Sequence, residues 1–161
     1  MDTSEETHGA GKAMAGQLKV ISGDLGYEYS DQVGHYLRKA YQRALAIFQK
    51  HCIDPNLTSV QFVALSALLT RGPKALSELG QLAAIDPSTT KGVVDRLKQR
   101  GLIEVANSPK DRRKTIISIS AKGAELVEAM VEPGHRVTED IMAPLNPAER
   151  VALVYLLAKI S

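Results

Sequence analysis

Apolar positions recur at helical spacing through most of the chain and divide it into amphipathic segments. Val33, Leu37, Ala40 and Ala44 fall three or four positions apart, which predicts a long helix over residues 30–52. Similar patterns predict further helices over residues 58–71, 77–84, 86–101 and 120–141, and from residue 146 onward, with Ser77, Ser120 and Asn146 as N-caps. Two short runs, residues 102–105 and 115–119, instead predict strands.

Capping and breaking residues support these boundaries. Thr58 and Gln61 have the spacing of a capping box, and Asp86-Pro87 places an N-cap before a proline suited to the first turn. Gly101 is expected to end the fourth helix. Pro133-Gly134 falls inside the fifth helical pattern, where we expect a kink.

The last helix is apolar on every side over residues 151–158. A surface helix of a monomer needs only one apolar stripe, so the other faces of this helix require cover. Two interpretations fit the pattern: a central core helix, or a helix shared between two subunits.

Residues 74–120 combine two short helices, joined by a tight turn at 84–87, with a hairpin. The second helix has Val93, Val94 and Leu97 on its inner face. Small hydroxyls and one cation begin its outer face: Ser88, Thr89, Thr90 and Lys91. Small donors allow a helix to approach a DNA groove, and a helix N-terminus favours phosphate. The order predicts a winged helix-turn-helix in a mainly α (α+β) fold.

Positive charge is concentrated in this lobe. The formal charge of the 161-residue chain is only +2, but residues 86–114 hold eight basic and four acidic residues. The hairpin tip reads NSPKDRRK over residues 107–114. Arginine suits a narrow minor groove, which favours groove contacts for Arg112 and Arg113 and phosphate contacts for Lys110 and Lys114. Asp111 is available to orient an arginine; Arg96 is a candidate for a phosphate contact or for an ion pair with Asp95 or Glu104. The alternative for the tip is a solvated hairpin.

The stretch VVDRLKQRGLIEVANSPKDRRKTIISISAKG, residues 93–123, resembles the signature of the MarR family of transcriptional regulators. The resemblance extends over about residues 30–161. It implies a homodimer joined by its first and last helices, with residues 88–91 in the major groove and Arg112 and Arg113 in the minor groove of a palindromic operator in double-stranded DNA. Ser108 stands where many members have Asp. Gly92 stands where members often carry a long polar residue, so it either permits close DNA approach or is merely tolerated.

A second candidate site lies around the first helix. Five of the seven aromatic residues fall between residues 27 and 48. Aromatic walls with a few polar anchors would suit a flat aromatic acid, for which the candidate ligand residues are Arg38, Tyr41, Phe48, His51 and Gln61. The alternative is an aromatic-lined dimer core in which His51 makes an ordinary helix-end contact.

Several stretches, such as YLRKAYQRALAIFQ, LTSVQFVAL and LNPAERVAL, resemble the MarR subgroup that represses nicotinate-degradation genes. The resemblance implies 6-hydroxynicotinate as the effector that releases the repressor from DNA. Within one MarR-like domain over residues 27–161, residues 30–71 and 121–161 would form the helical dimerisation and ligand region. Residues 1–26, rich in glycine and polar groups, are expected to form a flexible arm.

Other classes of function have weaker support. No catalytic motif such as GxSxG, HExxH, CxxC or GxGxxG is present, and we expect no enzyme activity, metal or cofactor. No apolar run approaches the roughly 18 residues of a membrane span, and the single cysteine fits a reducing compartment, so we expect a cytoplasmic protein. Two alternatives remain: a redox-sensing regulator acting through Cys52, and a winged helix used only for protein contacts.

Overall fold

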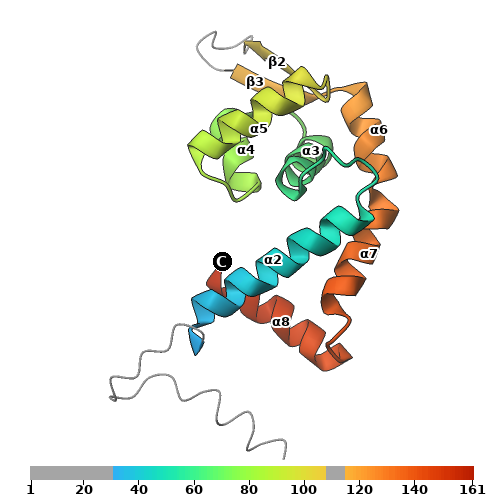
Figure 1. Cartoon of the computed structure of the whole chain (residues 1–161). Coiled ribbons are helices and arrows are strands. Elements are labelled where there is room, and N and C mark those ends of the chain that lie inside the picture. The colour runs from blue at the N-terminus through green and yellow to red at the C-terminus, as the bar shows by residue number, and fades with distance from the viewer. Residues whose placement is uncertain (1–30, 108–114) are drawn as a thin grey trace, which may run out of the picture. The chain divides into compact units, whose positions relative to one another are not determined.

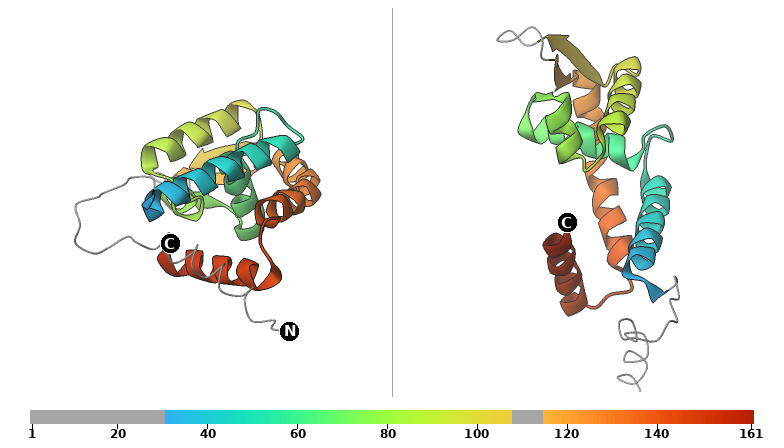
Figure 2. Two further views of the ribbon diagram at one scale, coloured as in Figure 1. Left: turned by 60° about the horizontal axis from the view of Figure 1, so that its bottom comes forward. Right: turned by 90° about the vertical axis from the view of Figure 1, so that its left-hand side faces the viewer.

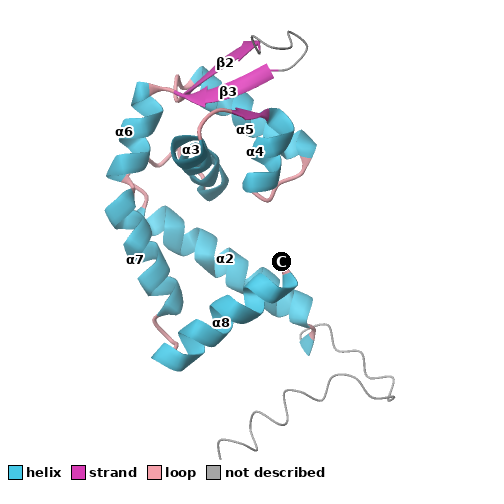
Figure 3. Ribbon diagram, turned by 180° about the vertical axis from the view of Figure 1, so that it is seen from behind, coloured by secondary structure: helices cyan, strands magenta, loops and turns pink. Residues whose placement is uncertain are grey.

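The computed structural model describes residues 31–107 and 115–161, which are mainly helical with a small antiparallel sheet (Figure 1; strands magenta in Figure 3). The expected arm over residues 1–26, the domain start at residue 27 and the tip over residues 108–114 lie outside the described residues. The described elements are, in chain order, α2 (Val33–His51), α3 (Ser59–Arg71), β1 (Lys74–Ala75), α4 (Leu76–Leu82), α5 (Pro87–Gln99), β2 (Ile103–Asn107), β3 (Thr115–Ile119), α6 (Ala121–Ala129), α7 (Val131–Met142) and α8 (Pro147–Ile160).

The chain divides into two compact units, residues 1–43 and residues 44–161, and α2 runs across the boundary. The second unit contains the main hydrophobic core. Leu65 and Leu68 of α3, Leu79 of α4, Leu97 of α5 and Ile117 of β3 are almost completely buried there. These apolar contacts fix α5 against α3, α4 and the sheet, so the helix that follows the tight turn is held by the core.

The strands form an antiparallel sheet in the order β1-β3-β2. Burial alternates along β2, where Ile103 is buried and Glu104 is exposed, as expected for a strand with one face on the core. The predicted hairpin is therefore confirmed. Strand β1 was not predicted, because two residues are too few to show alternation; it pairs with β3 through Lys74 and Ala75.

The predicted capping signals around the lobe are confirmed. The side chains of Thr58 and Asn146 accept hydrogen bonds from the backbones of Gln61 and Glu149, and both capping boxes are complete. Asp86 caps α5, and Gly101 follows that helix with φ of +67°, the left-handed conformation that favours glycine. These ends are determined by residues within three or four positions, which is why the sequence shows them.

Two predictions about helix boundaries were wrong. Ser77 is not an N-cap: α4 begins at Leu76, and the carboxylate of Glu78 accepts the N–H of Ala75 instead. The long fifth helix is two helices, which break at Met130 and follow one another (orange in Figure 2). Pro133 has no N–H for the carbonyl four residues earlier and its ring would meet that carbonyl, so it occupies the first turn of α7 rather than a helix interior.

The turn between α4 and α5 is as tight as predicted. Ala84 takes a left-handed conformation with φ of +52°, and the N–H of Ile85 bonds the carbonyl of Gly80. The two helices approach closely at Gly80, where an added Cβ would lie 2.6 Å from Oγ1 of Thr90. A larger residue at position 80 would therefore push the two helices apart.

Helix α8 has no buried residue, although its sequence is largely apolar. Val151, Tyr155 and Ile160 retain about two thirds or more of their surface, with exposures of 72%, 64% and 67%. This exposure is the opposite of what a core helix would show, so the core-helix interpretation is not supported. Separately, no helix within the described ranges is long and apolar enough to cross a membrane.

Candidate nucleic-acid interface and effector region

The first turn of α5 is organised by Asp86. Its carboxylate accepts the backbone N–H groups of Ser88 and Thr89, each at 3.0 Å, and the hydroxyl groups of the same two residues. These hydrogen bonds, from Ser88 first and Thr89 next, hold the pKa of Asp86 well below its usual range. The carboxylate therefore stays ionised at neutral pH and fixes the positions of two exposed hydroxyl groups.

This arrangement changes what the start of α5 offers to DNA. The amide donors that would meet a phosphate are already used by Asp86, whose negative charge repels a second anion. The sequence-based expectation of a phosphate at this N-terminus therefore has no support. The hydroxyl oxygens of Ser88 and Thr89 still have lone pairs that can accept from a base amine in a major groove.

Thr90 does not share that exposed surface. It is 1% exposed, and its hydroxyl donates to the carbonyl of Asp86 at 2.8 Å. Its side chain faces Gly80 of α4. We therefore correct the sequence-based assignment: Thr90 packs the two helices together and is not a DNA contact. The sequence did not show this, because three consecutive hydroxyl residues look alike before the direction of each side chain is known.

Lys91 and Arg96 are exposed on the face of α5 that does not pack against the core. The guanidinium of Arg96 folds back over Gly92, where an added Cβ would lie 3.7 Å from one of its nitrogens. That distance is an ordinary contact, so an alanine fits at position 92. No described residue pairs with the Arg96 guanidinium, which leaves it available to an anion.

An open cavity of about 390 Å³ adjoins this arginine. The residues that line it belong to the loop before α3, to α3 and to the end of α5, and all have polar or charged side chains: Asn56, Gln61, Arg96, Gln99 and Arg100. Gln61 is 3% exposed and its Oε1 accepts the N–H of Thr58. Because the oxygen must face that donor, the NH₂ group of Gln61 faces away from it. The candidate ligand residue Gln61 and the candidate DNA residue Arg96 thus line the same cavity.

The wing begins and ends within the described residues. Asn107 of β2 pairs with Thr115 of β3, which brings the two ends of the tip together. Lys110, Asp111, Arg112, Arg113 and Lys114 lie outside the described residues, so their contacts with DNA stay a prediction.

The candidate effector residues divide between the two units of the chain. Arg38 and Tyr41 belong to the first unit and are exposed, Tyr41 by 56%. Phe48 belongs to the second unit, where it is buried against Phe62 with ring centroids 5.9 Å apart. Phe48 therefore has a packing role within its own unit.

His51 makes a contact that the sequence did not reveal. Its Nε2 lies 2.8 Å from Oδ2 of Asp140 in α7, and Nζ of Lys50 lies 3.4 Å from the same oxygen. The hydrogen bond with His51, followed by that with Lys50, lowers the pKa of Asp140. The contact joins the end of α2 to α7 across 89 positions of sequence, a separation at which no local signal could have indicated it.

A helix-turn-helix whose second helix, α5, has an exposed basic surface, followed directly by a hairpin, defines a winged helix-turn-helix protein of the DNA-binding class. Residues 57–115 match the MarR family model. The chain is also 48% identical over 133 residues to the HTH-type transcriptional repressor NicR of Pseudomonas putida, which covers 83% of this chain and 84% of the relative. The protein belongs to the MarR family and is a transcriptional regulator rather than an enzyme.

Solved structures agree with this assignment. BpsR of Bordetella bronchiseptica, whose DNA binding is regulated by 6-hydroxynicotinic acid, is 48% identical with a TM-score of 0.79, over 83% of this chain and 96% of that one. A MarR mutant from E. coli complexed with operator DNA superposes with a TM-score of 0.75 over 86% of this chain and 99% of that one. At 21% identity, the second likeness concerns the fold alone.

Proposed function

We propose that the protein is a repressor that binds a palindromic operator in double-stranded DNA as a homodimer and is released by a small aromatic carboxylate such as 6-hydroxynicotinate. The observation that carries the proposal is the 48% identity to NicR and to BpsR, over more than four fifths of the chain. NicR is a transcriptional repressor, and 6-hydroxynicotinic acid regulates the DNA binding of BpsR. The exposed surface of α5 supports the DNA-binding part independently.

For the DNA contacts, we assign the major groove to Ser88, Thr89 and Lys91. Their side chains are exposed on the first turn and a half of α5, and Asp86 fixes the first two. Arg96, four residues beyond Gly92, is assigned to a backbone phosphate because its guanidinium has no partner among the described residues. Arg112 and Arg113 are assigned to the minor groove, Lys110 and Lys114 to phosphates, and Asp111 to orienting an arginine.

For the effector, Arg38, Tyr41, His51 and Gln61 stay candidates for direct contact, and Phe48 for shaping the site from the core. Among them, His51 already bonds a carboxylate, that of Asp140. The carboxylate of an aromatic acid offers the same chemistry, so it can replace Asp140 as the partner of the imidazole. In a two-state regulator, such binding weakens operator affinity only if the effector prefers the form that binds DNA poorly.

The wing provides the test of the DNA-binding part. An operator is first selected from a random-sequence DNA library with the full-length protein, and affinities are then measured by fluorescence anisotropy at several salt concentrations. Arg113→Ala should weaken operator binding by about tenfold or more, as expected for the loss of a groove contact. Lys114→Ala should weaken binding by a smaller factor, and it should reduce the slope of log affinity against log salt concentration by about one, as expected for the loss of one phosphate contact. Operator binding by Arg113→Ala that equals that of the wild type would show that Arg113 does not contact the operator and would contradict the role of the wing. The absence of salt-sensitive binding by the wild type would contradict the function itself.

A further inference from the structure

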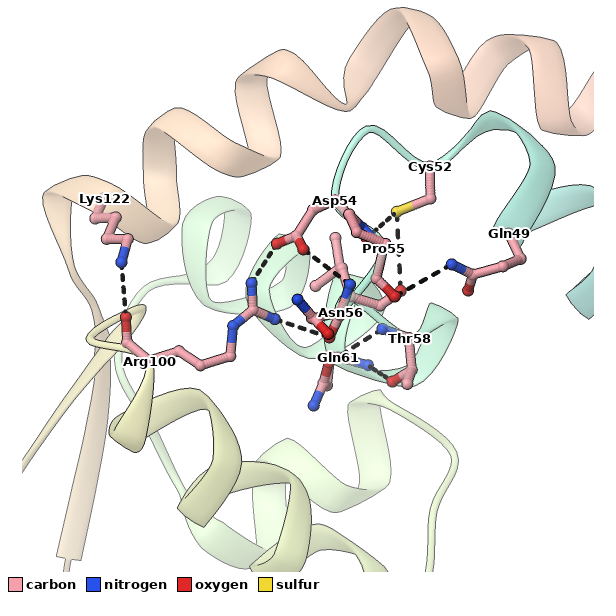
Figure 4. Close-up of polar contacts among 10 residues, drawn as sticks. Gln49, Cys52, Asp54, Pro55, Asn56, Thr58, Gln61, Arg100 and Lys122 are labelled. Carbon is pink, nitrogen blue, oxygen red and sulfur yellow. Dashed lines mark hydrogen bonds and ion pairs between the residues drawn. The ribbon is translucent and has the colours of Figure 1, made fainter.

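The C-terminal end of α5 is tied to the loop between α2 and α3 by Arg100 (Figure 4). Its guanidinium forms an ion pair with the carboxylate of Asp54 and donates to the carbonyl of Asn56 at 2.9 Å. The second oxygen of Asp54 accepts the N–H of Asn56 at 2.9 Å. Arg100, Asp54 and Asn56 thus form a closed ring of contacts, here called the Arg100 latch, across 46 positions of sequence.

Both ends of the latch are themselves anchored. On the loop side, the thiol of Cys52 donates to the backbone carbonyl of Asp54 at 3.2 Å, and the side-chain amide of Gln49 donates to the backbone carbonyl of Pro55. On the helix side, Lys122 of α6 donates to the carbonyl of Arg100 at 3.0 Å, where a cation also complements the C-terminal end of the helix dipole. Short polar contacts therefore connect the loop to the end of α5, so that a movement of the loop would also move that end of the helix.

The latch constrains α5 in a way that the core does not. Buried Leu97 fixes how close the helix lies to its neighbours, but apolar contacts have little directional preference. In contrast, a guanidinium that donates hydrogen bonds to two acceptors is held in one orientation. The ion-paired side chains retain only 27% and 20% of their exposure, so solvent screens them less than it screens a surface pair. Base-edge contacts need side chains placed within about 0.5 Å, which makes the direction of α5 important for DNA binding.

We infer that Arg100 is a positioning residue for operator binding: with Asp54 and Asn56 it holds the C-terminal end of α5 against the α2–α3 loop and so sets the direction in which α5 meets DNA. This inference rests on the proposed DNA-binding function. The latch begins three residues after His51, the candidate effector contact, so the loop that carries Asp54 continues directly from the end of α2.

The sign of one substitution separates positioning from electrostatics. Asp54→Asn removes a negative charge near a DNA-binding helix, so charge alone predicts tighter binding to DNA. The latch predicts the reverse, an operator affinity weaker by about fivefold to twentyfold, because the neutral amide no longer holds the guanidinium. Asn keeps the shape of the side chain and an oxygen for the N–H of Asn56. Asp95→Asn is the matched control: it makes the same change on exposed Asp95 of α5, which forms no ion pair with a described residue.

The measurements are operator affinities by fluorescence anisotropy, taken well below the melting temperature of each full-length variant, so that a loss of stability does not enter. Arg100→Gln should weaken binding as Asp54→Asn does, and the double variant should be no weaker than the weaker single one, because both remove one contact. The salt dependence of Asp54→Asn should equal that of the wild type, since the latch touches no phosphate.

Operator binding by Asp54→Asn as tight as that of the wild type, or tighter, would overturn the inference while leaving the DNA-binding function intact. Additive losses in the double variant would also overturn it, since Arg100 would then be acting on DNA directly. If neither the wild type nor Asp95→Asn bound any selected operator, the proposed DNA-binding function would be contradicted, and the inference about Arg100 would fail with it.

Discussion

Gly123 lies where the start of α6 passes over the backbone of Leu102. A Cβ at this position would be 2.1 Å from the carbonyl oxygen of Leu102 and 2.9 Å from a side-chain carbon of Ile119. The same carbonyl accepts the N–H of Ser120 at 3.1 Å, so it cannot turn away without losing that bond. Glycine is needed here for space, because α6 packs closely against Leu102 and Ile119 at this position.

Gly123→Ala should therefore lower the free energy of unfolding by about 3 kcal/mol, at the upper end of the cost of overpacking. Gly134→Ala is the control. It replaces another helical glycine, in α7, where nothing lies within 4 Å of the added Cβ, and it should raise the free energy of unfolding by up to about 1 kcal/mol. Urea unfolding followed by circular dichroism measures both changes. Equal stabilities of the two variants would show that the close approach at Leu102 is not real.

Asp86 gives the start of α5 a dependence on pH. Because its pKa is lowered in the folded chain, its contribution to stability is complete above the pKa of about 3.9 of an unfolded aspartate, and it is lost as the pH falls through the lower folded value. Asp86→Asn keeps an N-cap residue but does not titrate. The wild type should therefore be the more stable at pH 7, and the difference should shrink steadily below about pH 4. A difference that stays constant from pH 7 to pH 2 would contradict this role.

At the scale of elements, α5 has some features that the sequence predicted and others that it did not. Its cap at Asp86, its apolar face and its end at Gly101 depend on neighbours within four positions, and all were predicted. The inward direction of Thr90 and the latch at Arg100 depend on α4 and on the α2–α3 loop, which lie elsewhere in the sequence. Similarly, Pro133-Gly134 in the pattern of residues 120–141 predicted a kink, but the structure has a complete break three residues earlier, at Met130, with the proline in the first turn of α7.

Gly92 tests how closely α5 approaches DNA. An added Cβ meets only the Arg96 guanidinium, at ordinary contact distance, so Gly92→Ala should raise the free energy of unfolding by about 1 kcal/mol through helix propensity alone. Thermal unfolding gives this value, and a loss of stability would show that the space is not free. Operator affinity then decides between the two explanations: a loss indicates that glycine permits close approach, and no change indicates that it is tolerated.

At the scale of the whole molecule, the exposed apolar surface of α8 requires a partner. Val154 and Leu156 are each 55% exposed, and apolar surface of this extent on one helix marks an interaction site. We propose that this partner is a second copy of the chain, because homodimers are typical of the MarR family. A dimer places two α5 helices on two half-sites, which lie about 34 Å apart when separated by one turn of DNA.

Val154→Glu should split this dimer, because burying an unpaired charge in an apolar interface is costly. Sedimentation equilibrium should give the mass of two chains for the wild type and of one chain for the variant. Lys159→Gln, an exposed position on the same helix, should leave the dimer intact. A dimer that survives Val154→Glu unchanged would place the interface elsewhere.

The central proposal is that a small aromatic acid releases the protein, proposed to act as a homodimer, from its operator. The direct measurement is the fluorescence anisotropy of a labelled operator bound by the wild-type protein during titration with 6-hydroxynicotinate. 6-Hydroxynicotinamide, which lacks the carboxylate, serves as the matched control. We predict saturable release by the acid and little or none by the amide, because Arg38 and His51 are the residues proposed to bind the carboxylate. Operator binding that is unchanged at saturating acid would contradict the account.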